Sequence, residues 1–326
     1  GCKWQMIPYE QQIAYKQQQV QDQLTRIGHI ELPEMQPISG SPKQQYYRNK
    51  LEFTFSMLRY RTHEEIAEAG DTIIPQEHAP GLFDKVVEIN QCYLQTAPTD
   101  KLLRVLRDYS KLHNLPYYNY REHTGWLRNV VLRVARTGEI LVNLVIQHED
   151  KPKRIALLDH LLKEIPEITT LHYTINGKVN DSIYDLDVHT YHGKGYIEET
   201  LEEFKFKISP KSFFQTNTYQ AENLYRFTRD FAGLTGNETL YDLYCGTGSI
   251  GIFCSRRAKK VIGIEVVADA IEDAKLNAAA NGLDHCLFYA GDVADICTDE
   301  FFENHGRPDV IITDPPRAGM HEKLIQ

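Results

Sequence analysis

Long apolar runs are missing from this 326-residue sequence. No stretch of 18 consecutive apolar residues occurs, so we expect no membrane-spanning helix. The first residues, GCKWQMIPYEQQ, lack the basic-then-apolar layout of a secretory signal. They also lack an initiating Met, as a processed or trimmed segment would. These absences predict a cytoplasmic protein.

Paired cysteines are missing too. The six cysteines are Cys2, Cys92, Cys245, Cys254, Cys286 and Cys297. None forms a C-x-x-C pair, and a reducing compartment is expected, so we expect no disulfide framework.

Positive charge is scarce overall, and the net charge of −9 argues against nucleic-acid binding by the whole surface. Residues 101–136 differ, because eight Lys and Arg residues stand there against Asp108 and Glu122. Four tyrosines and Trp126 are interleaved with them. Basic groups contact phosphates and aromatic rings stack on unpaired bases, so this stretch suits single-stranded RNA. A solvated basic face with core aromatics explains the same pattern.

The order of predicted elements divides the chain into three parts. Residues 1–42 contain a polar helix, over about 5–27, and a connector with Pro and Gly. Residues 43–204 carry short β-rich runs with helices near 98–113 and 153–165, which predicts an α+β domain with a mainly antiparallel sheet. Residues 205–326 alternate strands with helices, which predicts βαβ units and a parallel sheet.

A glycine-rich loop, YCGTGSIG, lies between a predicted strand and helix of the third part. Gly246, Gly248 and Gly251 match G-x-G-x-x-G, and Glu265 ends the next strand, where a carboxylate can hold ribose hydroxyls. The match alone is weak, because a dehydrogenase and an S-adenosylmethionine enzyme both show it.

Two acids after later strands favour the S-adenosylmethionine enzyme. Asp292 follows the third strand of this part, and Asp314 follows the fourth, within ITDPPRAG. Each acid alone could be a helix cap or a turn residue. Together with the loop and Glu265 they would line one carboxyl edge of a parallel sheet, where such sheets bind ligands. No aromatic residue follows Asp-Pro-Pro, unlike in amino-group methyltransferases.

The segments SFFQTNTYQAENLY, LYDLYCGTGSIGIF, VIGIEVV and TDPPRAG together resemble the RNA uracil-5-methyltransferase family, and YYRNKLEFTF and LRNVVLR extend the match. The resemblance implies a Rossmann-like, C-terminally incomplete methyltransferase domain of the α/β class after an α+β RNA-binding domain. It places S-adenosylmethionine against Gln215, Tyr244, Gly246, Gly248, Ser249, Glu265, Asp292 and Asp314. Asp314 is also a candidate for positioning the substrate. RNA contacts are predicted at Arg48, Lys50, Arg128 and Arg133.

The ribosomal-RNA branch of the family carries a [4Fe–4S] cluster on four cysteines. By resemblance, Cys2 and Cys92 are two of the ligands and two others would precede Gly1. The cluster is therefore expected to be absent from this segment alone. The pattern favours 23S ribosomal RNA over transfer RNA as the partner.

The resemblance implies that a Cys thiolate adds to uracil C6, so that C5 can attack the sulfonium methyl group before a base removes the C5 proton. The family places this Cys and a Glu base beyond Asp-Pro-Pro-Arg. We therefore expect an inactive fragment that binds the cofactor weakly or not at all. We also expect a monomer. An amino-group nucleic-acid methyltransferase and a non-catalytic RNA-binding protein with a methyltransferase fold are the alternatives.

Overall fold

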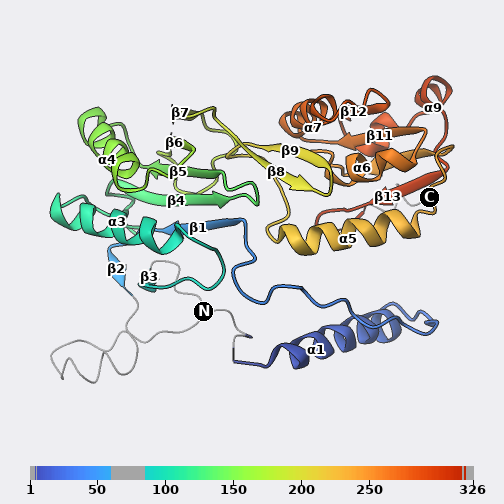
Figure 1. The fold of residues 1–326 in the computed structure, drawn as a ribbon, viewed down its shortest axis with the longest axis horizontal. Helices are drawn as coiled ribbons and strands as arrows, with labels where there is room; N and C mark the ends of the chain where they lie inside the picture. Colours follow the sequence, from blue (N-terminus) through green and yellow to red (C-terminus); the bar gives the residue numbers. More distant parts are fainter. Residues whose placement is uncertain (1–3, 5, 60–84, 318, 321–326) are drawn as a thin grey trace.

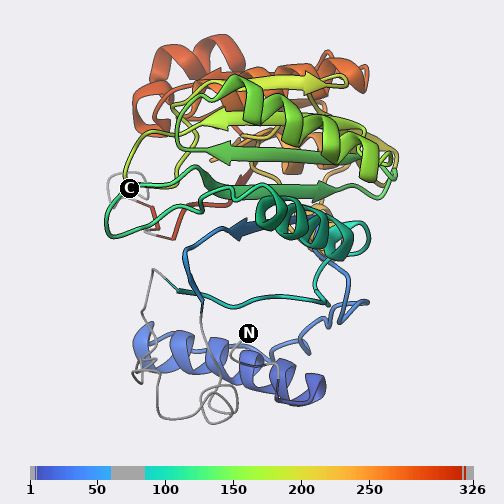
Figure 2. The ribbon, with the colours of Figure 1, turned by 90° about the vertical axis from the view of Figure 1, so that its left-hand side faces the viewer.

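The structure is a computed structural model that describes residue 4 and residues 6–59, 85–317 and 319–320. The chain begins with α1 (Tyr9–Asp22), which continues into one π-helical turn (Gln23–Ile27). The connector then runs back along α1. Gln17 accepts a hydrogen bond from the backbone N–H of Ile38, and the Tyr9 hydroxyl accepts one from Ser41 N–H. Figures 1 and 2 show α1 below the rest of the molecule.

A five-stranded mixed sheet forms the central part, in the order β1-β4-β5-β6-β7. The strands are β1 (Lys50–Thr54), β4 (Leu127–Val134), β5 (Ile140–Ile146), β6 (Thr170–Ile175) and β7 (Val188–His192). Only the β5–β6 pair is parallel, and α4 (Lys151–Glu164) makes that crossover. The predicted, mainly antiparallel sheet and both predicted helices are therefore present. A short parallel pair, β2 (Leu58–Arg59) and β3 (Lys85–Val86), lies beside it.

Helices α3 (Thr99–Leu112) and α4 cover one face of this sheet (Figure 1). Leu102 and Leu106 of α3 pack with Leu157 and Leu161 of α4 against alternate residues of β4 and β5. The opposite sheet face mixes polar and apolar residues and is also buried, with Asn143 fully covered and Asn129 2% exposed. Burial lowers the pKa of His172 on this face to about 4, so its imidazole is neutral near pH 7.

A β-hairpin joins the two halves of the molecule. Its strands are β8 (Ile197–Leu201) and β9 (Phe204–Ile208). The hairpin crosses residue 204, where the sequence predicts a domain boundary, and its apolar residues share one core with the third part of the chain. Phe204 packs against Phe253 with ring centroids 6.1 Å apart.

The third part contains a parallel four-stranded sheet in the order β12-β11-β10-β13. The strands are β10 (Thr239–Leu243), β11 (Lys260–Glu265), β12 (Cys286–Ala290) and β13 (Val310–Thr313). One face packs against α5 (Thr218–Phe231), α6 (Ser249–Cys254), α7 (Ala268–Ala280) and the hairpin. The other meets α8 (Val293–Ile296) and α9 (Asp299–His305). This is the predicted Rossmann-like arrangement.

No helix within the described residues is both long and apolar enough to cross a membrane.

Candidate cofactor and RNA site

The carboxyl ends of the four parallel strands bring the predicted acids to one edge. The strand order places Asp292 after β12, Glu265 at the end of β11, Tyr244 after β10 and Asp314 after β13, side by side. Chain order reverses between β10 and β13, and such switch points form ligand crevices in open α/β sheets. Four elements that are separate in sequence therefore make one edge.

Glu265 links the glycine-rich loop to the next turn. Its Oε2 accepts a 3.2 Å hydrogen bond from Gly246 N–H, and its Oε1 accepts a 3.0 Å bond from Val267 N–H. The backbone N–H of Gly291 donates to the Glu265 carbonyl at 2.9 Å, so the turn before Asp292 is held against the same residue. A carboxylate offers about four acceptor positions, so two remain for ribose hydroxyls.

The loop itself has the backbone shape that a close ligand needs. Gly246 and Gly248 have φ angles of +54° and +75°, and Tyr244 adopts +63°. A left-handed conformation costs a non-glycine residue about 1–3 kcal/mol and is concentrated at functional sites. A Cβ at Gly246 would have nothing within 4 Å, so open space lies beside this backbone. The described residues therefore fit an adenosyl ligand.

Ser249 is held through its side chain and Gln215 through its backbone carbonyl. Ser249 begins α6, and its Oγ lies 2.9 Å from the hydroxyl of Tyr225, a buried residue of α5. Gln215 is half-buried, and its backbone carbonyl accepts a 2.8 Å bond from Asn49 Nδ2. Asp292 caps α8 through Ala294 N–H at 2.9 Å. Asp292 therefore caps a helix, as the alternative interpretation predicts, and its Oδ2 forms no hydrogen bond with another described residue.

Three exposed apolar residues at this edge were missed from the sequence. Val266 and Val267 follow Glu265 and are 66% and 52% exposed. Phe213 is 63% exposed, and its carbonyl accepts a 3.4 Å bond from Thr247 Oγ1 in the glycine-rich loop. An apolar residue next to a strand ordinarily indicates core, so only the structure reveals these surfaces for a planar base.

The four predicted RNA contacts separate into two pairs. Arg128 is fully buried, and its guanidinium donates to the carbonyls of Asn176 and Asn180 and to Asp181 Oδ1. Arg133 is 2% exposed and donates to the Ser212 carbonyl, and burial lowers its pKa to about 10. Direct RNA contact does not fit these positions, because both side chains hold protein loops.

Arg48 and Lys50 are only half-buried and remain predicted RNA contacts. Arg48 forms an antiparallel bridge with Asn217, which joins the central part to the segment after Gln215. Burial, followed by the charge of Arg133, lowers the pKa of Lys50.

The predicted cluster ligands are only partly within the structure. Cys92 is buried, with its backbone N–H bonded to Asp100 Oδ1 at 2.8 Å. Cys2 lies outside the described residues. Within the described ranges no group of three or more His, Cys, Asp or Glu residues could hold a metal ion. These residues alone therefore do not fit a four-thiolate cluster.

Comparison with known proteins identifies methyltransferases similar to this chain. Residues 234–323 match the family described as a methyltransferase domain. An uncharacterized RNA methyltransferase of Bacteroides thetaiotaomicron is 51% identical over 333 residues, which cover 100% of this chain and 73% of that protein. Another, from Porphyromonas gingivalis, is 50% identical, with 100% and 72% covered.

A solved structure matches the whole fold. The tRNA (uracil-54, C5)-methyltransferase of Pyrococcus abyssi, in complex with S-adenosyl-L-homocysteine, superposes with a TM-score of 0.76 at 26% identity. The match covers 100% of this chain and 72% of that one. These similarities do not favour the ribosomal-RNA branch over the transfer-RNA branch. The chain therefore belongs to the RNA uracil-5-methyltransferase family.

Proposed function

We propose that the protein methylates C5 of uracil in RNA with S-adenosylmethionine as methyl donor. The observation that carries this proposal is the row of Asp292, Glu265, Tyr244 and Asp314 along one sheet edge, beside a glycine loop with open space at Gly246. Glu265 would hold the ribose and Asp292 the adenine amino group. Asp314 would lie between the methyl donor and the base.

Uracil C5 is a weak nucleophile, so a thiolate must first add to C6. The described cysteines of the methyltransferase domain do not suit that role. Burial raises the pKa of Cys254 and Cys286 to about 12, that of Cys245 well above its ordinary value, and that of Cys297. We infer that a cysteine outside the described residues supplies the thiolate, and that residues 1–326 tested alone release no C5 hydrogen.

The experiment that tests the proposal measures tritium release. The intact protein is incubated with S-adenosylmethionine and transcripts that carry [5-³H]uridine, one of transfer RNA and one of 23S ribosomal RNA. Methylation at C5 must expel that hydrogen, whereas methylation of an amino group leaves it in place. Release of tritium supports the proposal, and methyl transfer without release would support the amino-group alternative.

The choice of RNA rests on two opposing indications. The Cys2 and Cys92 pattern favours 23S ribosomal RNA, whereas the similar solved enzyme acts on transfer RNA. We propose 23S ribosomal RNA as the substrate and [4Fe–4S] as a group of the intact protein. Tritium release from the transfer-RNA transcript alone would contradict the first, and iron-free, fully active protein the second.

A further inference from the structure

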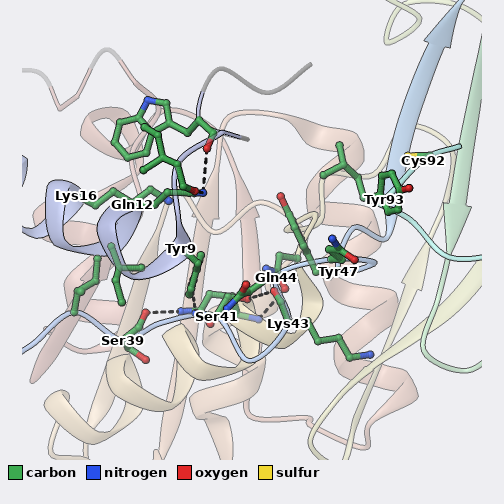
Figure 3. Close-up of a pocket in the computed structure, with 18 of the residues that line it drawn as sticks. Tyr9, Gln12, Lys16, Ser39, Ser41, Lys43, Gln44, Tyr47, Cys92 and Tyr93 are labelled. Atoms are coloured by element: carbon green, nitrogen blue, oxygen red, sulfur yellow. Dashed lines mark hydrogen bonds between the residues drawn. The ribbon is translucent and has the colours of Figure 1, made fainter. Parts of the chain in front are cut away.

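A cavity of about 920 Å³ lies between α1 with its connector and the central part of the chain. Figure 3 shows Gln12 and Lys16 of α1 on one side of it and Tyr47 and Tyr93 on the other. None of the residues predicted to bind S-adenosylmethionine lines this cavity, although Cys92, a predicted cluster ligand, does. It is therefore a second hollow, and the methyltransferase edge does not explain it.

The chemistry of the cavity differs from that of the protein as a whole. The net charge of the chain is −9, yet no Asp or Glu occurs among the described residues of the lining. Lys16 and Lys43 supply positive charge, and Lys16 forms no hydrogen bond or ion pair with another described residue. Glutamine and asparagine amides make up most of its other polar groups. Amides can pair with base edges, and ammonium groups attract phosphates.

Aromatic rings are exposed at the same place. Tyr46 and Tyr93 are 36% and 45% exposed, and the centroids of their rings lie 6.1 Å apart. Tyr46 N–H donates to the Tyr93 carbonyl at 2.7 Å, which fixes the connector to the loop of Cys92. Tyr46 also has a φ of +53°, a strained conformation for this residue. Tyr47, like Tyr93, belongs to the lining of the cavity, whereas Tyr46 lies next to Tyr47 in sequence outside that lining. Such rings stack on unpaired bases of any sequence.

The lining of the cavity is also close in sequence to a residue bonded to the methyltransferase edge. Asn217 and Gln220, at the start of α5, belong to its lining. Four residues earlier, the Phe213 carbonyl is bonded to Thr247 of the glycine-rich loop. Four steps of fully extended chain reach at most about 14 Å. A strand of RNA that fills the cavity would therefore reach the methyl donor within a few nucleotides.

We propose that this cavity binds unpaired nucleotides of the substrate RNA that flank the target base. Tyr93 and Tyr47 stack on the bases, and Lys16 and Lys43 contact the phosphates. The inference rests on the proposed function for its choice of RNA, but it assigns the contact to residues outside the basic stretch 101–136.

The test measures RNA binding separately from methylation. The intact protein is titrated into a fluorescent single-stranded oligouridine of about 12 nucleotides. Tyr93→Leu and Tyr47→Leu are each expected to weaken binding roughly 10-fold, since each removes one stacking ring. Lys16→Gln should reduce the slope of log K against log[salt] by about 0.7. The matched control is Phe231→Leu, which changes an aromatic residue 77% exposed at the far end of α5.

Melting temperature and S-adenosylhomocysteine affinity are measured for every variant, so that unfolding is not taken for lost RNA binding. Lys16 is exposed, so Lys16→Gln keeps the test valid if a tyrosine variant does not fold. Binding at the wild-type level in Tyr93→Leu and Lys16→Gln would overturn the inference, and so would equal weakening by Phe231→Leu. If the variants bind normally while wild-type protein releases tritium, the cavity proposal fails and the proposed function stands.

Discussion

The backbone N–H of Gly251 donates a 2.7 Å hydrogen bond to Oδ2 of Asp242, whose side chain is fully buried behind the glycine-rich loop. The other carboxyl oxygen has no partner among the described residues. Burial is the main cause that raises the pKa of Asp242 to about 7, and the negative charges of Asp314 and Glu265 add to it. The carboxyl group thus joins strand β10 to helix α6. Its contribution to the free energy of unfolding depends on pH.

We predict that Asp242→Asn gains stability relative to wild type as the pH rises. Below about pH 4 the carboxyl is protonated in both states. Between pH 4 and 7 the folded state keeps a proton that the unfolded state releases, so wild-type stability falls across this window. Asn does not titrate, and its amide oxygen can still accept from Gly251 N–H. Urea unfolding should show the difference in unfolding free energy growing by a few kcal/mol.

The control for this prediction is Asp284→Asn, at an exposed position before β12. Its stability should follow that of wild type at every pH. Parallel curves for Asp242→Asn and wild type between pH 4 and 7 would contradict the raised pKa.

Alanine at Gly246 and at Gly248 should have different effects. At Gly248 a Cβ would lie 2.8 Å from the Phe288 ring, in addition to the strain of φ +75°. At Gly246 the strain is similar, but the Cβ would enter open space. We expect Gly248→Ala to lower the unfolding free energy by about 2–4 kcal/mol and Gly246→Ala by about 1 kcal/mol. Denaturant unfolding measures both losses.

Cofactor affinity should be reduced more by Gly246→Ala than by Gly248→Ala, which is the reverse of their order in lost stability. The Cβ of Gly246→Ala would occupy the space proposed for the adenosyl ligand, so affinity for S-adenosylhomocysteine should fall at least about 10-fold in folded protein. Calorimetric titration provides the measurement. Unchanged affinity in Gly246→Ala would place the ligand elsewhere.

The sequence predicted which acids share one sheet edge better than it predicted which arginines are exposed, for a physical reason. Glycines and acids at strand ends have fixed positions once the parallel sheet is recognised, so Glu265, Asp292 and Asp314 could be placed together. Arg128 was predicted as an RNA contact because it lies in the basic stretch 101–136 and in the segment LRNVVLR that resembles the family. Its burial depends on a loop some 50 residues later in the chain, whose carbonyls it binds.

The exposed apolar residues show the opposite error, because the sequence suggests that they are buried. Val266 and Phe213 look like core residues in sequence, since apolar side chains near strands are usually buried. The structure leaves them uncovered at the sheet edge. Long-range packing decides burial, and no local pattern around either residue records it.

Arg128→Met should destabilise the fold without changing phosphate contacts. The guanidinium lies 4.1 Å from the centroid of the Tyr118 ring and is bonded to the loop that follows β6. Its loss leaves several carbonyls and Asp181 without their donor, so we expect about 2–4 kcal/mol less stability in urea. The salt dependence of RNA binding should keep its wild-type slope.

Arg104→Met is the matched variant, because Arg104 is exposed on α3 within the basic stretch. It should leave stability unchanged. If Arg104 contacts a phosphate, the salt slope should fall by about 0.7–0.9. A lower slope in folded Arg128→Met would show that this buried arginine reaches RNA after all, against the present assignment.

Glu265→Gln should weaken cofactor binding more than it weakens the fold. An amide has one acceptor oxygen where the carboxylate has two, so one of the N–H groups of Gly246 and Val267 loses its partner. The uncharged amide also accepts more weakly from ribose hydroxyls. We expect roughly 10-fold or greater loss of S-adenosylhomocysteine affinity by calorimetry, with about 1 kcal/mol lost in stability.

The control is Glu272→Gln on α7, where the exposed carboxylate is paired only with Lys275 among the described residues. Exposed pairs of this kind contribute about 0–1 kcal/mol, so neither stability nor affinity should change measurably. Equal affinities for Glu265→Gln and wild type would remove Glu265 from the ribose site. The proposed row of contacts along the sheet edge would then consist of Asp292, Tyr244 and Asp314.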